Sequence, residues 1–181
     1  MSCVSRAALF VGALTVACSS TPEAEPQEEE PRLGSTAITP SGKPERRFAF
    51  MTVDGRRVTH RTFRGRMTVV ALATTYDTAS LAQIRFLESL VRTHTPRING
   101  LLLLFDPDEN RPLLPTFASA LDLSFPVAVP DDATREGEGA FPGLHHVPSV
   151  IILDRQGREV WRKLGLSDSR ELASALGSLE K

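Results

Sequence analysis

Both cysteines of this chain, Cys3 and Cys18, lie within its first 18 residues, and no thiol occurs in residues 19–181. This distribution excludes a fold held together by disulfide bonds and a structural zinc site built on cysteine. It also excludes cysteine-based catalysis by the body of the protein, because such chemistry needs a thiolate. The folded part must therefore depend on an apolar core.

The size and charge of the chain are those of an ordinary globular protein. It has 181 residues, of which 41% are hydrophobic and 24% charged, which suits one domain. The 21 basic residues nearly balance the 22 acidic ones, for a formal net charge of -1. Nucleic-acid-binding domains usually carry a basic excess, so we expect no nucleic-acid partner.

The first 17 residues have the pattern of a signal peptide. Arg6 precedes an apolar run over residues 7–17, which is too short for a transmembrane helix of about 20 residues. The run ends in TVAC, residues 15–18, which resembles the lipobox of bacterial lipoproteins, although Thr15 stands where that family usually has Leu. The resemblance implies cleavage before Cys18 and lipidation of this residue.

This interpretation predicts where the protein is found. Residues 1–17 are then a lipoprotein signal peptide, and the mature protein is anchored in the cell envelope through lipidated Cys18, facing the periplasm. By resemblance to lipoprotein sorting, an Asp directly after the lipidated cysteine would keep the protein from the outer membrane. Ser19 occupies this position here, which favours the outer membrane. The alternative is a plain secretory signal that is cleaved after an alanine.

Residues 18–46 differ in kind from what precedes and follows them. They contain five prolines, an acidic run at residues 28–30 and no aromatic residue. Such a segment cannot bury enough apolar surface to offset its chain entropy, so we expect a disordered tether. A flexible coil of this length spans about 30 Å, which would hold a domain away from a membrane.

Residues 47–181 alternate between strand and helix patterns. The predicted strands are a hairpin around Asp54-Gly55, the apolar runs at 67–73, 101–105, 125–129 and 147–153, and a partner strand at 159–164 that carries Trp161. The predicted helices are one with an apolar stripe of Leu81, Ile84, Leu87 and Val91, capped by Asp77 or Thr78 and ended by Pro96, and two more at 113–121 and 167–179. This order predicts an α/β domain whose partly parallel sheet is covered on both faces.

Four segments of this domain, in order, resemble a known family. They are FMTVDGRRV at 50–58 with FRGR at 63–66, VVALAT at 69–74, FPV at 125–127, and VPSVIILDRQG at 147–157. Together they resemble periplasmic thioredoxin-like proteins of the TlpA and redoxin type. The resemblance implies a thioredoxin-like fold over residues 47–181, with a central mixed β-sheet flanked by helices and an N-terminal β-hairpin extension. It also implies a cis peptide bond before Pro148, facing the family's active site.

The family's redox motif is missing. Its Cys-x-x-Cys pair should open the first helix, and Tyr76 and Ala79 occupy those two positions. A peroxidatic Thr-x-x-Cys is also absent, because that pattern ends here in Thr78. Disulfide exchange requires a thiolate, and a hydroxyl cannot replace it. The resemblance therefore implies the fold without the family's chemistry, and we expect no catalytic residue and no cofactor.

Three other features could carry a function. His145 and His146 precede Pro148 and could bind a metal or act as a base; adjacent residues of an extended segment point to opposite faces, so we expect no metal site. Thr74, Thr75, Thr78 and Ser80 could pair with these histidines as a nucleophile, but helix capping explains Thr78 and Ser80 more simply. Five arginines between residues 56 and 66 form a solvated hairpin face or a contact with anionic lipid or an acidic partner.

The hypothesis that follows is a non-catalytic binding or scaffolding module for an envelope protein or peptide. By resemblance, the loop at Pro148 pairs with extended peptide by strand addition. Val147, Pro148 and Ser149 would hold the peptide backbone, and the groove would be lined by Thr75, Tyr76, Thr78 and His146. The alternatives are a thiol–disulfide oxidoreductase homologue by descent and a metal carrier that uses His145 and His146.

Overall fold

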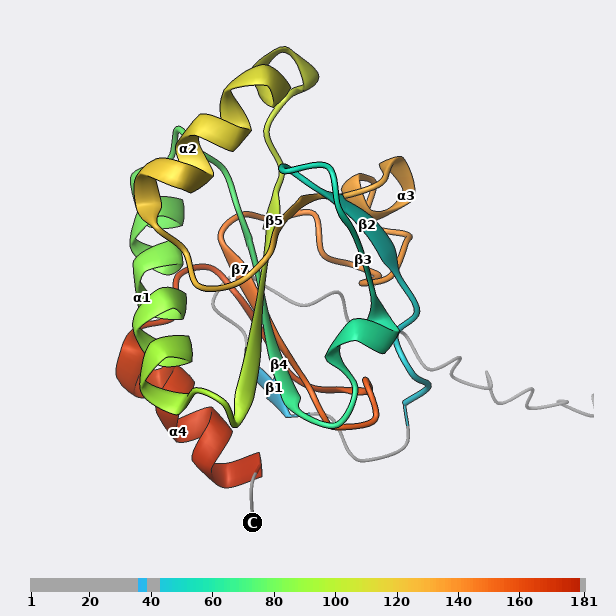
Figure 1. The fold of residues 1–181 in the computed structure, drawn as a ribbon. Helices are drawn as coiled ribbons and strands as arrows, with labels where there is room; N and C mark the ends of the chain where they lie inside the picture. The colour runs from blue at the N-terminus through green and yellow to red at the C-terminus, as the bar shows by residue number, and fades with distance from the viewer. Residues whose placement is uncertain (1–35, 39–42, 180–181) are drawn as a thin grey trace, which may run out of the picture.

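The computed structural model describes residues 36–38 and 43–179. The expected signal peptide, Cys18 and most of the expected tether lie outside these residues. No helix in the described part of the chain is both long and apolar enough to span a membrane. The described residues form one sheet with helices packed against it (Figure 1).

The strands of the sheet follow the order β1-β8-β7-β4-β5-β6-β2-β3. The bounds are β1 (Thr36–Ile38), β2 (Ala49–Thr52), β3 (Arg57–Thr59), β4 (Met67–Ala73), β5 (Ile98–Leu104), β6 (Val127–Val129), β7 (Ser149–Leu153) and β8 (Glu159–Leu164). Neighbours β4, β5 and β6 are parallel, whereas β7, β8 and the β2–β3 hairpin pair antiparallel. The sheet is therefore mixed, as expected, with β4 buried along its whole length.

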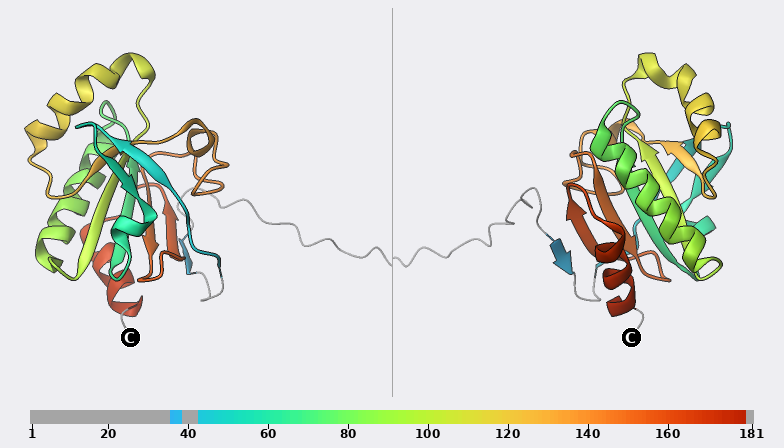
Figure 2. Two further views of the ribbon diagram at one scale, coloured as in Figure 1. Left: turned by 45° about the vertical axis from the view of Figure 1, so that its right-hand side comes forward. Right: turned by 90° about the vertical axis from the view of Figure 1, so that its left-hand side faces the viewer.

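The helices lie mainly on one face of the sheet (Figures 1 and 2). They are α1 (Thr78–His94), α2 (Leu114–Leu121), the short α3 (Asp132–Arg135) and α4 (Ser169–Leu179), with two 3-10 helices, η1 (His60–Phe63) and η2 (Asp108–Leu113). Side chains of α1, α2 and α4 share a core cluster with β4 and β5. The opposite face is closed by the twisted hairpin, by η1 and by the segment between α3 and β7, which bring together Phe48, Phe50, Phe63 and Phe141.

Helix α1 begins after Asp77, one of the two caps that we expected. Its buried face differs from the predicted stripe, because Leu81 is 37% exposed whereas Ile84 and Leu87 are fully buried. In the first turns of the helix a fully buried position is held by the polar side chain of Gln83, whose Oε1 accepts the backbone N–H of Ser167, just before α4, at 2.7 Å. Apolar spacing alone could not show that a polar group takes this place.

Strand pairing already occurs before residue 47, where we expected the folded domain to begin. β1 lies within the segment interpreted as tether and pairs antiparallel with β8. Glu45 forms an isolated bridge with Arg158, and Nη2 of Arg46 lies 2.9 Å from the Glu159 carboxylate. A strand at the edge of a sheet can be very short. The three residues of β1 therefore suffice to pair with β8, although they leave no strand pattern in the sequence.

Two predicted strands are shorter than expected, and both corrections involve proline. The strand predicted at 125–129 begins at Val127, and the one predicted at 147–153 begins at Ser149. Pro126 and Pro148 have no N–H to donate to a sheet ladder, so regular pairing starts after them. The 3-10 helices and α3 had no counterpart among the predicted elements.

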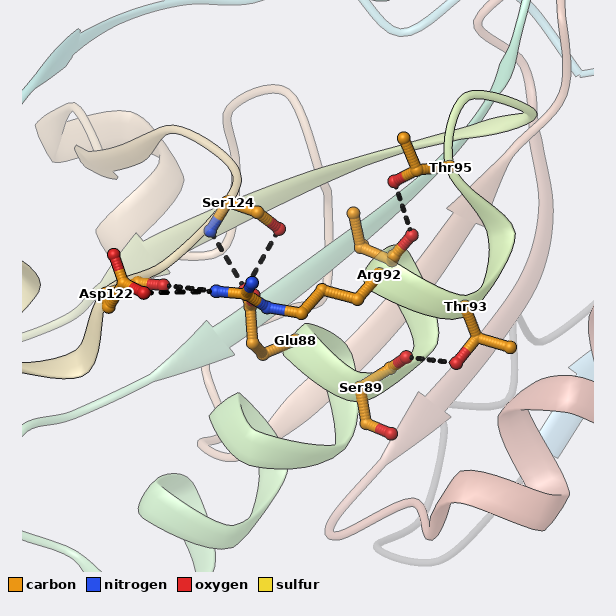
Figure 3. Close-up of polar contacts among 8 residues, drawn as sticks. Glu88, Ser89, Arg92, Thr93, Thr95, Asp122 and Ser124 are labelled. Carbon is orange, nitrogen blue, oxygen red and sulfur yellow. Dashed lines mark hydrogen bonds and ion pairs between the residues drawn. The ribbon is translucent and has the colours of Figure 1, made fainter.

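A buried carboxylate joins the end of α1 to the segment after α2 (Figure 3). Glu88 is 7% exposed, and its Oε2 accepts the backbone N–H of Ser124 at 3.0 Å and the Ser124 hydroxyl at 3.2 Å. Its Oε1 accepts Nε of Arg92, and Nη2 of Arg92 also donates to the carbonyl of Asp122 at 2.8 Å. Both oxygens of the Glu88 carboxylate thus accept hydrogen bonds within the fold, which indicates a structural role for this side chain.

We expect Glu88→Ala to lower the free energy of unfolding by about 2 kcal/mol, because the donors of Ser124 lose their acceptor in a partly buried place. Urea unfolding should show a lower midpoint at an unchanged m-value. Glu138→Ala is the matched control, since Glu138 is exposed and should shift the free energy by no more than about 0.5 kcal/mol. Equal shifts for the two variants would contradict a stabilising role for Glu88.

Candidate functional site

The segment before α1 and the loop before β7 meet at one edge of the sheet. Leu72 of β4 pairs with Ser149 of β7 in antiparallel register. Continuing this register by two residues places Thr74 opposite Val147. The two segments that hold the expected site residues therefore meet at this edge, although more than 70 positions separate them in the chain.

The loop at Pro148 leaves one residue with free backbone groups. The Val147–Pro148 peptide bond is cis, as the resemblance implied. Pro148 is buried, and its carbonyl accepts the N–H of Gly165 at 2.9 Å. The N–H and C=O of Val147 make no hydrogen bond with any residue that the structure describes. Val147 can therefore donate and accept one backbone hydrogen bond to an incoming strand.

Ser149 cannot play the part that we expected for it. It is fully buried, and it pairs with Leu72 on one side and Leu164 on the other. Its hydroxyl donates to the carbonyl of His146 at 2.7 Å. Because β7 is a central strand, its first residue has neighbours on both sides, so Ser149 shapes the loop and offers nothing to a peptide.

Tyr76 and Ala79, which the resemblance aligns with the family's two cysteine positions, differ in environment. Tyr76 is 66% exposed, whereas Ala79 is half-buried in the first turn of α1. Between them, the Asp77 carboxylate accepts the N–H groups of Ser80 at 2.8 Å and Ala79 at 3.3 Å. These contacts, above all the one from Ser80, lower the pKa of Asp77. The positive end of α1 is thus occupied by a carboxylate of the chain itself.

Thr75 is anchored to the fold instead of lining an open groove. Its N–H donates to Oδ2 of Asp106 at 3.0 Å, and its hydroxyl donates to Oδ1 of the same carboxylate. Asp106 is fully buried, and its carbonyl accepts Nη1 of Arg135 at 2.9 Å. Sequence reasoning missed Asp106 and Arg135. The signal in the sequence was that Asp106 directly follows a predicted buried strand. Because the carboxyl ends of parallel strands meet at one edge of the sheet, its carboxylate could be expected near the end of β4.

The two histidines do not lie as we expected. His145 and His146 are exposed, but their ring centroids are only 4.4 Å apart. The expectation of opposite faces assumed an extended strand, whereas this segment bends before β7 begins. Within residues 36–38 and 43–179, no group of three or more His, Cys, Asp or Glu side chains could hold a metal ion.

The hydroxyl cluster is arranged for packing. Thr74 and Ser80 are both buried, and their hydroxyl oxygens lie 3.5 Å apart. Thr78 is exposed at the first position of α1. Among the hydrogen bonds of the described residues, none joins one of these hydroxyls to His145 or His146. The arrangement therefore lacks the contact between nucleophile and base that hydrolytic chemistry needs.

Apolar side chains flank the free backbone of Val147. Leu166 is 42% exposed and follows Gly165, whose N–H contacts Pro148. Tyr76, which is 66% exposed, follows by two residues the position that the continued register of β4 and β7 sets opposite Val147. A hollow of about 420 Å³ between α2 and the β2–β3 turn involves none of these residues. The candidate site is thus the backbone of Val147, with two exposed apolar side chains, Tyr76 and Leu166, on the neighbouring segments.

Comparisons with known proteins bear on the fold. Neither a protein-family model nor a curated protein matches this sequence. Among solved structures, a DsbF homologue from Corynebacterium diphtheriae is similar at a TM-score of 0.67 and 15% identity, over 86% of this chain and 96% of that one. A secreted thiol–disulfide isomerase from Corynebacterium glutamicum is similar at a TM-score of 0.65 and 16% identity, over 87% and 96%.

A third similar structure is the exposed lipoprotein thioredoxin of Streptococcus pneumoniae, at a TM-score of 0.61 and 17% identity, over 73% of this chain and 98% of that one. Identities this low establish the fold and not the activity. The chain has a thioredoxin-like fold, as the resemblance implied. The redox reaction of such neighbours uses thiols that residues 19–181 of this chain do not contain.

Proposed function

We propose that this protein binds an extended peptide segment of an envelope protein at the Pro148 loop, without disulfide chemistry. The observation that carries the proposal is the pair of free backbone groups on Val147 beside a buried proline. Strand addition needs only an N–H and a C=O that are free on an exposed stretch of backbone. This function does not need sulfur, so it is compatible with the absence of cysteine from residues 19–181.

Affinity and selectivity would come from different groups. The peptide backbone would accept the Val147 N–H and donate to the Val147 carbonyl, which any sequence can do. Tyr76 and Leu166 would contact apolar peptide side chains on either side, because exposed aromatic residues supply large contact areas at low entropic cost. Thr78 and His146 are exposed and complete the border of the groove.

The test starts from a phage-displayed library of random ten-residue peptides, panned on the full chain. We expect selected peptides to bind Tyr76→Ala at least about tenfold more weakly, which corresponds to roughly 1.4 kcal/mol. Leu113→Ala is the matched control, because Leu113 is 64% exposed but lies in η2. The proposal would be wrong if the selected peptides bound both variants as tightly as the unaltered chain. It would also be wrong if the library yielded no binder.

The second part of the proposal is the anchor. Cys18, in its lipobox-like setting, would carry lipid and hold the domain in the cell envelope, on the outer membrane as Ser19 suggests. One similar structure is itself described as an exposed lipoprotein. Labelled fatty acid should appear on the full chain in cells and be absent from Cys18→Ala. Label that persists in Cys18→Ala would show that the lipobox interpretation is wrong.

One alternative rests on the neighbours named as thiol–disulfide proteins. In that case the chain would catalyse exchange between thiols of its partners. The full chain, incubated with dithiothreitol and insulin, decides between the two functions. We expect insulin reduction at the rate of buffer alone, because the chain has no thiolate near the Pro148 loop to attack the disulfide. Turnover above that rate would favour the oxidoreductase.

A further inference from the structure

Three arginines form a row across one end of the sheet. Arg66 and Arg97 directly precede Met67 and Ile98, which pair in the parallel register of β4 and β5. On the other side of β4, the antiparallel register of β4 and β7, continued by two residues, places Arg155 opposite Arg66. The N–H of Gly65 donates to the carbonyl of Arg155 at 2.9 Å, which independently joins these two turns. Figure 1 shows β4 and β5 beginning at this lower edge.

The charges of this row are not neutralised by the described residues. Arg66, Arg97 and Arg155 are exposed, and none of their side chains forms an ion pair or hydrogen bond with a residue that the structure describes. In contrast, Arg64 nearby makes a two-pronged contact with Glu45, with both distances 2.8 Å. Neighbouring strands are about 4.8 Å apart, so three like charges lie close together and favour an anionic partner.

The near-neutral total charge hides a strong separation of charge along the chain. Residues 43–66 carry eight basic side chains against two acidic ones. Residues 19–42 carry one basic side chain against five acidic ones, all five of which are glutamates at positions 23–30. Besides the arginine row, the chain therefore contains a run of glutamates at 23–30 whose charge is opposite to that of the row.

We propose that the arginine row of Arg66, Arg97 and Arg155 binds the acidic segment 23–30 of the same chain. We infer this occupant because its charge is opposite to that of the row and because it is covalently joined to the same domain. A segment that is joined to the domain by a few residues acts at an effective concentration of about millimolar. An anionic lipid surface or an acidic peptide of another protein must reach the same row without this advantage.

The connecting chain is long enough. Thr36 pairs with Lys163 near the far end of β8. From Lys163 back to Arg158, beside the turn that holds Arg155, is a distance of about 17 Å along the strand. The six residues from Glu30 to Thr36 span up to about 20 Å when extended, and the glutamates at 23–29 reach further. The acidic segment can thus arrive at the row while β1 stays paired.

The docked state leaves the Pro148 loop free. The arginine row lies where β4 begins, and the loop lies where β4 ends, a strand length of about 20 Å away. This inference does not depend on the proposed function. If Cys18 also carries a lipid anchor, as proposed above, docking would hold the basic edge toward the anchor and the peptide-binding loop away from it.

The experiment places a nitroxide spin label within the acidic segment. The full chain carries Ala24→Cys as the attachment site, with Cys3→Ser and Cys18→Ser to keep the label at one position. Amide signals of Arg66, Arg97 and Arg155 should weaken at least about twofold against the reduced label at about 20 mM salt, and recover at about 500 mM, where screening is strong. The spectrum itself reports whether each variant is folded.

Matched variants identify the two partners. The broadening should disappear when Glu28, Glu29 and Glu30 are changed to Gln, and in Arg66→Gln/Arg97→Gln. It should persist in Arg85→Gln/Arg170→Gln, which removes the same charge from exposed positions on α1 and α4. Broadening that is absent at low salt, or that survives in Arg66→Gln/Arg97→Gln, overturns the proposal. So does an unbroadened chain that binds phosphatidylglycerol vesicles through the row, since the occupant is then lipid.

Discussion

Replacing Glu159 with alanine should lower the free energy of unfolding by about 3–5 kcal/mol, the usual cost of breaking a buried ion pair from one side. The Glu159 side chain is 1% exposed and accepts two hydrogen bonds from Arg162, at 2.7 and 2.8 Å, and one from Arg46 at 2.9 Å. Without it, the largely buried Arg162 guanidinium would keep its charge without an acidic partner among the described residues.

The same guanidinium also positions the site. Nη1 of Arg162 donates to the carbonyl of Pro142 at 2.7 Å, within the segment that leads to Val147. We therefore expect Glu159→Ala to loosen this segment as well as the sheet. The amides of Gly143 and Leu144 donate to the carbonyls of Gly137 and Phe141. Their hydrogen exchange should accelerate more than that of the β4 amides, because local opening adds to the global loss of stability.

Thermal unfolding gives the direct measurement. A loss of this size should lower the Tm by roughly 6–20 °C, at about 2–4 °C per kcal/mol for a chain of this length. Glu171→Ala is the matched control, because Glu171 also pairs with a basic residue, Lys163, but its side chain is 33% exposed. Such a pair contributes at most about 1 kcal/mol. Equal Tm shifts for the two variants would show that burial of Glu159 is not what makes its ion pair important.

The second large effect is a gain of activity. We expect Tyr76→Cys/Ala79→Cys to accelerate insulin reduction by dithiothreitol at least about tenfold over the unaltered chain, because a thiolate can then attack the disulfide. Val147 can hold the insulin backbone beside the new thiols. Cys3→Ser and Cys18→Ser are present throughout, so that no other thiol contributes.

A displaced pair of cysteines provides the control. Leu113→Cys/Thr116→Cys places the same spacing at the start of α2, where both side chains are exposed. This variant has a thiol pair at a helix start but no adjacent Pro148 loop. If it matches the pair at 76 and 79, the loop contributes nothing to substrate binding and the proposed peptide site loses its support. If neither pair is active, the fold alone does not prepare this position for disulfide chemistry.

Strongly local features of this protein could be predicted from its sequence. The bounds of β4 agree with the apolar run at 67–73, because a strand buried on both faces is apolar along its whole length. The bounds of β8 agree with the strand predicted at 159–164. The cap of α1 at Asp77 could be predicted because a short polar side chain there accepts the helix's own N–H groups. The absence of thiols in residues 19–181 likewise follows from the sequence alone.

The site itself depended on contacts between distant residues. The sequence placed Thr75 in the groove, whereas the structure binds it to Asp106, 31 positions away. It placed Ser149 on the peptide, whereas neighbours on both sides bury it. The arginine row arises only because three strands begin or end at one edge.

Local sequence therefore determined where the longer strands and helices form, and that thiol chemistry is excluded from residues 19–181. Tertiary structure decided which polar groups remain free. A backbone or side-chain group is free only when no partner from elsewhere in the chain reaches it, and that depends on packing between residues far apart in sequence. Val147 retains its N–H and C=O for this reason, whereas the carbonyl of Pro148, one residue later, is taken by Gly165.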